Sequence, residues 1–554
     1  MKRLIITLLL AALALCPQPL EAGGGAARVR GVASAPVDMS YLDGADFSLF
    51  LGGAEHKAVS LAAPASDAEE EISTLPPSYD LREKGWNPPL RDQGNSPLCW
   101  AFASAASIES NLALHNGYGE TDVSEYLFGY MSLQDVSGDK PSFTWTSEID
   151  VSSDGITVSQ GTYSMAAAFL ARGDGPVSEA SAPLNMDVYA DYEADEYVYT
   201  YSFYRPSNFT PLAGLRAVYS LGADRDAIKR AIMEYGAVYC ELDADDDYFL
   251  YYDAYFKSEE RGKLTHAVAI VGWDDTYNKD NFKPKQPGSN GAWIVRDSAG
   301  SDVHGGFDGN GYLMPGDGYF YLSYEEGSLA NIAVYVMDPR INTNEYIYEY
   351  DPCGRVGMMS ADGEDGGYSQ IEGSASSSGG ATRAWGANVY TARRGAEITA
   401  AGFYAASPGS EYKITIEAVA GDGAPRGEVL ASAEGTLELP GYSRIDFQTP
   451  ARVEAGEKFS VVLEINSPGY GWPLAYEYAM ENYSEKAAPN PGKSFYSADG
   501  ENWTSMGERG DLCIKAFAAE DPASSGGGCS GGAGAWALLT VPFAVVLFRI
   551  RRKK

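Results

Sequence analysis

The stretch RDQGNSPLCWAF (residues 91–102) places a glutamine six residues before a cysteine, and tryptophan and a run of small residues follow that cysteine. Ala105, Ile108 and Leu112 continue at helical spacing, which predicts a helix that begins at Cys99. The amides and the dipole of a helix N-terminus favour negative charge, and the thiolate is the reactive form of cysteine. Cys99 is therefore a candidate nucleophile, with a buried structural thiol as the alternative.

A nucleophilic cysteine also needs a general base, a group that orients this base, and donors for the oxyanion. His56 lies in an irregular leader, and His304 lies in a glycine-rich loop. His115 would end the helix that Cys99 begins, about 24 Å away at a rise of about 1.5 Å per residue. His266 opens the apolar run HAVAIVGW, which predicts a buried strand. Among the four histidines, His266 is the best candidate for the base.

Four blocks of this sequence resemble, in order, the motifs of papain-like (C1-type) cysteine peptidases. They span residues 75–326 and read LPPSYDLREKGWNPPLRDQGNSPLCWAFASAASIES, QGTYSMAAAFLARGDGPVSE, THAVAIVGWDD and AWIVRDSAG…DGYFYLSYEE. The resemblance implies a two-lobed α+β peptidase domain and a role for each matching residue. The implied roles are nucleophile for Cys99, base for His266, oxyanion-hole donor for Gln93, orienting group for Asp297 and substrate-backbone contact for Gly161.

The sequence departs from the family pattern on both sides of this implied site. In QGNSPLCW, Ser96 replaces a disulfide cysteine, so that bridge is absent, and Pro97 and Leu98 replace glycine and serine. In VRDSAG, Asp297 replaces an asparagine. A carboxylate still accepts a hydrogen bond from imidazole, and it also favours the protonated ring. Ala299 stands where a tryptophan usually shields this contact, so we expect a water-exposed and weaker hydrogen bond.

Helical patterns disappear beyond residue 340, and alternating segments such as YKITIEAV and KFSVVLEI take their place between Gly, Pro, Asp and Asn residues. Alternation of this kind predicts an all-β sandwich over residues 341–520. The region resembles the lectin-like β-sandwich that follows some bacterial papain-like peptidases, which implies a carbohydrate or another cell-surface ligand. Four aromatic residues are candidates for stacking on sugars, with packing in the core as the alternative: Trp385, Tyr470, Trp472 and Trp503.

Both ends of the chain carry signals for export and membrane attachment. Residues 1–22 have a basic start, an apolar core and a small-residue cleavage site, which predicts a secretory signal peptide. Residues 23–74 are predicted to be a propeptide or leader. A Gly/Ser linker with Cys529 (residues 521–531) precedes a hydrophobic span with a basic end (residues 532–554). This tail resembles Gly-Gly-Cys sorting signals of Synergistes-group bacteria, with a simple membrane anchor as the alternative, so we expect attachment to the membrane or cell surface.

Composition narrows the classes of partner. The formal net charge of −35 at pH 7 argues against nucleic acid, because phosphate binding needs basic surfaces. The six cysteines are scattered and predict no disulfide framework, which leaves open whether Cys353 pairs with Cys513. The acidic run DADDDYF lacks the ligand spacing of a calcium loop. We therefore expect neither a metal nor another cofactor.

The sequence thus predicts a papain-like α+β domain at residues 75–340 and an all-β domain at residues 341–520. The function that fits is an exported, surface-held cysteine endopeptidase that hydrolyses proteins or peptides through a thiolate–imidazolium pair and an acyl-enzyme. The alternative is a catalytically weak or inactive peptidase fold that acts as a surface adhesin and binds glycans or proteins through the β-sandwich. Gln93, Cys99 and His266 together favour the enzyme, because a scaffold does not need them.

Overall fold

The computed structural model describes residues 32, 35–37, 39–51, 75–87, 89–94, 96–116, 121–133, 150–151, 157–158, 160–184, 186–191, 196–201, 210–244, 253–257, 264–283, 285–301, 303–306, 316–343, 345–365, 380–419, 425–481 and 483–520. The predicted signal peptide, His56, the linker with Cys529 and the predicted sorting tail lie outside these residues. Within the described ranges, no helix is long and apolar enough to cross a membrane.

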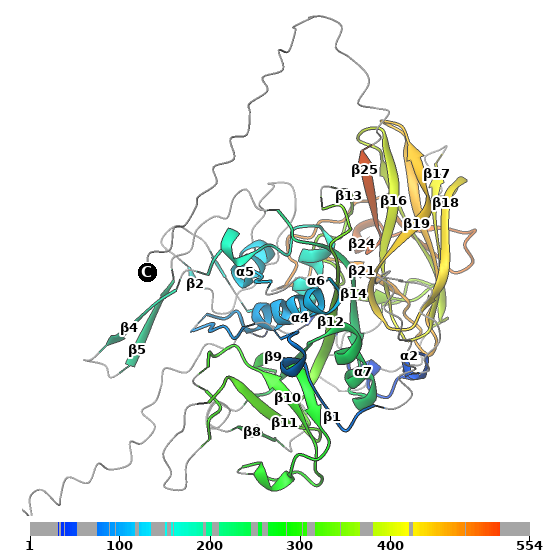
Figure 1. The fold of residues 1–554 in the computed structure, drawn as a ribbon. Coiled ribbons are helices and arrows are strands. Elements are labelled where there is room, and N and C mark those ends of the chain that lie inside the picture. Colours follow the sequence, from blue (N-terminus) through cyan, green and yellow to red (C-terminus); the bar gives the residue numbers. More distant parts are fainter. Residues whose placement is uncertain are drawn as a thin grey trace, which may run out of the picture.

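Three of the four longest described helices gather in one lobe of the first domain (Figure 1). α4 (Cys99–Asn116) runs through this lobe, and α5 (Glu125–Leu133) and α6 (Tyr163–Ala171) pack beside it. Small buried residues such as Ala105 let neighbouring elements approach the axis of α4. The buried side-chain oxygen of Asn111 accepts a backbone N–H from an adjacent strand at 2.8 Å. The helix predicted to begin at Cys99 is confirmed, and its first turns are buried.

The remaining helices are short, apart from α7, which packs against α4. Their bounds are η1 (Met39–Leu42), α2 (Ser48–Leu51), α3 (Leu81–Lys84), η2 (Glu179–Ser181), α7 (Arg225–Tyr235), η3 (Lys279–Asn281) and η4 (Gly507–Arg509). α7 begins where the side chain of Asp224 accepts the backbone N–H of Ala227 at 2.7 Å. It ends at Gly236, whose φ of 97° only glycine adopts readily.

One twelve-stranded sheet runs through both domains. Its main path, in spatial order, is β13 (Tyr346–Tyr348), β25 (Lys515–Glu520), β16 (Ala396–Ala405), β19 (Gly441–Val453), β6 (Gly214–Leu221), β12 (Ala330–Asp338), β7 (Val238–Leu242), β9 (His266–Asp274), β10 (Ala292–Arg296), β11 (Tyr319–Ser323) and β8 (Ala254–Tyr255), with β1 (Ser78–Asp80) paired to β9. The sheet therefore crosses the boundary predicted at residue 340. Two short hairpins lie apart from it: β2 (Asp150–Val151) with β3 (Thr157–Val158), and β4 (Met186–Asp191) with β5 (Glu196–Tyr201).

The crossing between the domains is the antiparallel pair of β6 and β19, in which Gly441 lies opposite Tyr219. Gly441 has a φ of 124°, and a Cβ atom there would lie 2.1 Å from the carbonyl oxygen of Val218. Only glycine permits this approach of the two backbones. The two domains are consequently joined by backbone hydrogen bonds as well as by the connecting chain.

The second layer of the β-sandwich is a six-stranded sheet. Its order is β18 (Glu428–Leu437), β17 (Ser410–Ala418), β20 (Lys458–Asn466), β15 (Arg383–Thr391), β22 (Ser494–Ser497) and β23 (Thr504–Ser505), and a further small sheet contains β14 (Gly357–Met359), β21 (Leu474–Glu477) and β24 (Asp511–Leu512). Ile414 and Ile416 on β17 and Val461 and Leu463 on β20 are buried in one core with residues of β16 and β19. The strands that the sequence predicted here are confirmed, but Thr415, Glu417 and Ser460 on the predicted polar faces are buried as well.

Part of the predicted leader packs on both domains. The ring of Tyr41 stacks on Tyr470 of the β-sandwich, with 4.3 Å between ring centroids. Phe50 stacks on Tyr235 at the end of α7, at 6.2 Å. Apolar side chains of residues 35–51 join the main core of the first domain. The described part of the leader thus contacts both domains.

Candidate active site

Cys99, His266 and Asp297 lie on three elements that meet between the helical lobe and the sheet. Cys99 is the first residue of α4, His266 is the first residue of β9, and Asp297 directly follows β10. β9 and β10 are antiparallel neighbours, and α4 packs against β9 (Figure 1). All three residues are buried, and the Cys99 side chain acts electrostatically on the His266 ring. The structure therefore places the candidate nucleophile beside the candidate base.

Asp297 holds the other side of the His266 ring. His266 Nε2 lies 2.7 Å from Asp297 Oδ1. Burial lowers the pKa of His266, but the charge and hydrogen bond of Asp297, assisted by Cys99, outweigh burial and raise that pKa to about 9. Burial also opposes the Asp297 charge, yet His266 and His304 hold the pKa of Asp297 well below its usual range. At neutral pH the pair is an imidazolium and a carboxylate, and Nδ1 is the ring nitrogen that can serve Cys99.

Gln93 links the loop before Cys99 to the segment after β10. Its backbone N–H donates to the carbonyl oxygen of Ser298 at 2.8 Å, and its side-chain oxygen accepts the Ser298 hydroxyl at 2.5 Å. Its side-chain Nε2 donates to the carbonyl oxygen of Ser96 at 2.8 Å. The Ser96 hydroxyl donates in turn to the Gln93 carbonyl at 2.8 Å. These hydrogen bonds hold the loop in which the family pattern has a disulfide cysteine.

Gly161 lies against the residue that follows the candidate nucleophile. A Cβ atom at Gly161 would lie 2.3 Å from the ring of Trp100. Gly161 also forms an isolated parallel β-bridge with Val32 of the leader. The backbone of the leader therefore occupies the position that the resemblance implies for the backbone of the substrate.

Sequence reasoning missed His304. Its Nε2 lies 2.8 Å from Asp297 Oδ2, so the Asp297 carboxylate joins two imidazole rings. His304 has a φ of 65°, and its ring packs against Phe320 on β11 with 4.8 Å between centroids. The only signal in the sequence was a histidine seven residues after Asp297. No periodicity or motif marks a loop side chain that folds back onto the end of a strand.

His304 also changes the expectation drawn from Ala299. The side chain of Asp297 has 0% of its surface exposed, and Ala299 itself is 6% exposed. His304, backed by Phe320, occupies the Oδ2 side of the carboxylate. The expectation of a water-exposed contact between His266 and Asp297 is therefore wrong, because other side chains provide the shielding that the missing tryptophan would give.

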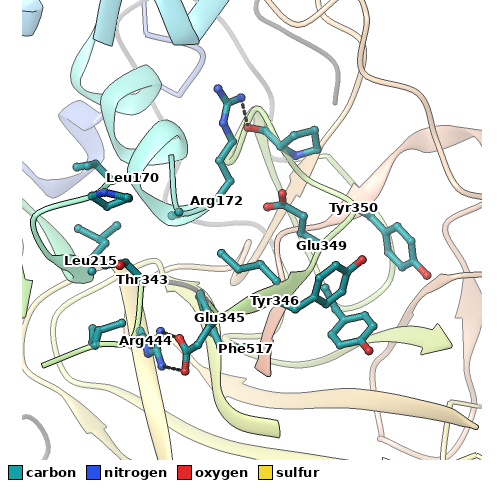
Figure 2. Close-up of a pocket in the computed structure, with 18 of the residues that line it drawn as sticks. Leu170, Arg172, Leu215, Thr343, Glu345, Tyr346, Glu349, Tyr350, Arg444 and Phe517 are labelled. Atoms are coloured by element: carbon teal, nitrogen blue, oxygen red, sulfur yellow. Dashed lines mark hydrogen bonds and ion pairs between the residues drawn. The ribbon is translucent and has the colours of Figure 1, made fainter. Parts of the chain in front are cut away.

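A second candidate site is a cavity of about 950 Å³ where α6, the segment that connects the domains and the β-sandwich meet (Figure 2). Glu345 holds Arg444 through two hydrogen bonds of 2.6 and 3.0 Å, and Arg172 pairs with Asp174. The buried cations of the cavity wall are therefore matched by carboxylates of the protein. Half-buried aromatic surface comes from Tyr346 and Tyr350.

The four aromatic residues considered for sugar stacking lie elsewhere. Tyr470 is 8% exposed and is covered by Tyr41 of the leader, and Trp472 packs edge-on against Tyr470 at 5.6 Å. Trp503 is half-buried and donates its Nε1–H to the carbonyl oxygen of Gly500 at 3.2 Å. The half-buried Trp385 lies beside the same glycine, because a Cβ atom at Gly500 would be 3.0 Å from Trp385 Nε1. None of the four lines the cavity of Figure 2 among the described residues.

Comparison with protein families assigns both domains. Residues 75–128 and 159–316 match the papain family cysteine protease, and residues 347–518 match the lectin like domain. The curated relatives include mouse (Mus musculus) cathepsin S, which is 25% identical over 243 residues (43% of this chain, 58% of the relative). Human (Homo sapiens) cathepsin L2 is 26% identical over 243 residues (43% and 60%). The chain thus spans about three fifths of the length of these two relatives.

Solved structures extend the likeness to both domains together. The clostridial cysteine protease Cwp84 after propeptide cleavage is 24% identical, with a TM-score of 0.60 over 80% of this chain and 99% of that chain. A structure of the cysteine protease and lectin-like domains of Cwp84 from Clostridium difficile is 23% identical, with a TM-score of 0.60 over 80% and 89%. At this identity the likeness concerns the fold. The first domain of this chain therefore belongs to the papain family of cysteine proteases, and a lectin-like domain follows it.

Proposed function

We propose that this protein is an exported, surface-held cysteine endopeptidase with Cys99 as nucleophile and His266 as general base. The observation that carries the proposal is the placement of Cys99, at the start of a buried helix, beside His266, whose Nε2 is held by Asp297. Burying the imidazolium of His266 with the carboxylate of Asp297 costs free energy, and a thiol with only a structural role would gain nothing from this pair. The family match supports the same chemistry.

The acylation step uses the thiolate–imidazolium pair. The sulfur of Cys99 forms a bond to the carbonyl carbon of the peptide, and the carbonyl oxygen takes up the negative charge. The backbone N–H of Cys99 and the side-chain amide of Gln93 are the proposed donors to that oxygen. His266 gives its proton to the amine nitrogen as the C–N bond breaks, which leaves a thioester on Cys99.

The deacylation step reverses the direction of proton transfer. Neutral His266 accepts a proton from water, the water oxygen attacks the thioester carbonyl, and the sulfur of Cys99 leaves as a thiolate. The product acid departs, and the thiolate–imidazolium pair is restored. Asp297 accepts the Nε2–H of His266 throughout and takes no proton itself, because its pKa is held low.

The leader is proposed to keep the enzyme inactive until it is removed. Val32 pairs with Gly161 through backbone hydrogen bonds of a parallel bridge. Gly161 is the residue proposed to hold the backbone of the substrate. The same groups cannot bind the leader and a substrate at once, so cleavage of the leader is required for turnover.

The proposed location rests on the ends of the chain. The predicted signal peptide supports export, and the hydrophobic tail with its basic end supports retention at the membrane or cell surface. Among the similar structures, Cwp84 is described as a surface layer associated protein of Clostridium difficile. Fractionation of cells, with antibody detection on intact cells and after removal of the tail, tests this part of the proposal.

Labelling with an epoxide or vinyl-sulfone inhibitor tests the peptidase proposal. Processed full-length protein should be labelled at one site, and the label should be absent from Cys99→Ala. Cys240→Ala is the matched control, because Cys240 is a buried thiol whose pKa is raised by burial. No labelling of processed protein at any pH between about 4 and about 8 would rule the proposal out.

A second function, ligand binding by the lectin-like domain, is favoured by the cavity of Figure 2. Sugars are bound by aromatic faces next to planar polar side chains, and the lining of this cavity includes Tyr346 and Tyr350 as well as Arg444 and Glu345. A glycan array with full-length Cys99→Ala should give binding that falls in Tyr350→Ala. Binding without turnover by the wild-type chain would favour the adhesin over the enzyme, and no binding would remove this function.

A further inference from the structure

The Asp297 carboxylate is shared between two imidazole rings. Its Oδ1 lies 2.7 Å from His266 Nε2, and its Oδ2 lies 2.8 Å from His304 Nε2. The backbone N–H of Ser298 also donates to Oδ1, at 2.7 Å. The side chains of Asp297 and His304 have no exposed surface, so water does not compete for these contacts. Both oxygens of the carboxylate are committed to donors of the protein.

His304 is held by more than this hydrogen bond. Its φ of 65° lies in the left-handed region, which is uncommon for residues other than glycine, although Asn, Asp and His adopt it more often than most. Its ring packs against Phe320 on β11. The position of the ring is therefore determined by backbone, packing and hydrogen bond together, and the Nε2 atom is aimed at Asp297.

The arrangement divides one negative charge between two donors. The titratable groups that act on His266 are Asp297 and Cys99, and those that act on Asp297 are His266 and His304. A histidine donates from Nε2 either as the protonated ring or as the neutral tautomer with its proton there. In both forms the donor stabilises negative charge on Oδ2. Asp297 consequently attracts the proton of His266 less than a carboxylate with an uncommitted second oxygen would.

We propose that His304 is a positioning residue for the peptidase reaction: its Nε2–H fixes and partly neutralises Asp297, so that Asp297 presents one oriented acceptor oxygen to His266. This inference rests on the proposed function. An amide in place of Asp297 would present one uncharged acceptor oxygen to His266. The hydrogen bond from His304 makes the Asp297 carboxylate more like such an amide, because it occupies one oxygen and reduces the charge on the other. His266 then remains acidic enough to protonate the leaving amine.

Two matched amide variants test the proposal. The protein used is the complete chain after removal of the leader. Gln in His304→Gln can place an N–H near the position of the ring Nε2. Asn in His304→Asn is favoured in left-handed backbone but is too short to reach Asp297. We expect His304→Asn to lower kcat about tenfold at unchanged KM and to move the alkaline limb of kcat up by about half a pH unit. His304→Gln should stay within about threefold of the wild type.

The comparison of the two variants decides between positioning and packing. Equal kcat values and equal alkaline limbs in His304→Asn and His304→Gln would overturn the proposal. An equal loss in both variants would also overturn it, because that result assigns His304 only to packing against Phe320. A loss in His304→Asn that His304→Gln restores supports it.

A second readout does not depend on turnover. In the full-length Cys99→Ala background, NMR titration of the His266 ring should give a higher pKa with His304→Asn than with His304→Gln, and signal dispersion reports whether each chain is folded. Equal titration of His266 in the two chains would contradict the inference. If the wild-type protein hydrolyses no peptide but the pKa of His266 still differs between the two variants, the proposed function is refuted. The coupling of His304 to His266 is then retained.

Discussion

Two buried clusters of charge in this protein respond to burial in opposite ways. In the candidate active site, Asp297 keeps a pKa well below its usual range in spite of burial, because two histidines surround it. Where the two domains meet, burial raises the pKa of Asp351 to about 6, against the attraction of Lys515. Glu477 in the same cluster has a pKa well above its usual range, again through burial and through Asp351.

The number of donors for each carboxylate explains the difference. Asp297 alone accepts from His266, His304 and the backbone of Ser298. In the second cluster, Lys515 Nζ lies 2.7 Å from Glu349 and 2.9 Å from Asp351, so one cation is divided among several acids. A buried carboxylate stays ionised where donors outnumber acids, and it is driven towards its neutral form where acids outnumber donors. The first arrangement suits catalysis, and the second makes the domain junction sensitive to pH.

The largest expected effect is the loss of the orienting group. Asp297→Ala should lower kcat/KM about 10²- to 10⁴-fold, because His266 loses both its orientation and the charge that stabilises its protonated form. The control is Asp317→Ala, which removes a carboxylate of the same region whose side chain is 69% exposed. Steady-state kinetics with a peptide substrate checks this. A fall of only a few fold would mean that Asp297 is a structural acid.

Removing the shared cation should damage the domain junction. Lys515→Met leaves Glu349 and Asp351 buried without their cation, which should destabilise the fold by about 3–5 kcal/mol at neutral pH. Urea unfolding of the full chain measures this. Lys413→Met is the control, since Lys413 lies on β17 with 53% of its side chain exposed and should change stability by less than about 0.5 kcal/mol. Equal midpoints for the two variants would contradict the view that Lys515 holds the cluster.

Asp351 should make stability depend on pH in the direction opposite to that of a paired acid. Its pKa is about 6 in the folded chain and 3.8 without perturbation, so the folded state binds protons more tightly. Its contribution is complete below pH 3.8 and is lost as the pH rises through about 6. The stability of the wild type relative to Asp351→Asn should thus rise by roughly 2 kcal/mol from pH 7.5 to pH 4.

Asp338 provides the contrasting control for this experiment. Arg340 and Arg216 lower the pKa of Asp338 to about 2 against the opposing effect of burial. The stability of the wild type relative to Asp338→Asn should therefore fall, not rise, as the pH drops below about 4. Urea unfolding at several pH values measures the stability of the wild type relative to each variant. If this relative stability changes with pH in the same direction for both variants, the comparison between the two kinds of cluster is wrong.

The smallest effect is expected when the charge of Asp297 is removed but its acceptor is kept. Asp297→Asn can still accept the His266 Nε2–H, so kcat should stay within about tenfold of the wild type. Without the negative charge, the pKa of His266 falls, and the alkaline limb of kcat/KM should move down by about one pH unit. An unmoved limb would show that Asp297 orients His266 without tuning its pKa.

The residues that sequence reasoning placed in the site lie at the ends of regular elements. Cys99 begins a helix, His266 begins a strand, and Asp297 follows a strand, so their positions could be predicted from local patterns and from the papain-like motifs. The structure brings these three together, and it places Gly161 against Trp100. Their catalytic roles remain predictions. His304 could not be found in this way, because its loop returns to Asp297 through a left-handed turn that no motif encodes.

The amino-acid sequence by itself determined the helix at Cys99, the alternating strands of the β-sandwich and the order of the two domains, because side-chain periodicity and motifs are local properties of the chain. Only the tertiary structure decided which distant side chains share a proton or a charge. It joined the domains through Gly441, laid Val32 on Gly161, and set His304 behind Asp297. Such contacts depend on the path of the backbone in space, and burial then sets how strongly each charge acts on its neighbour.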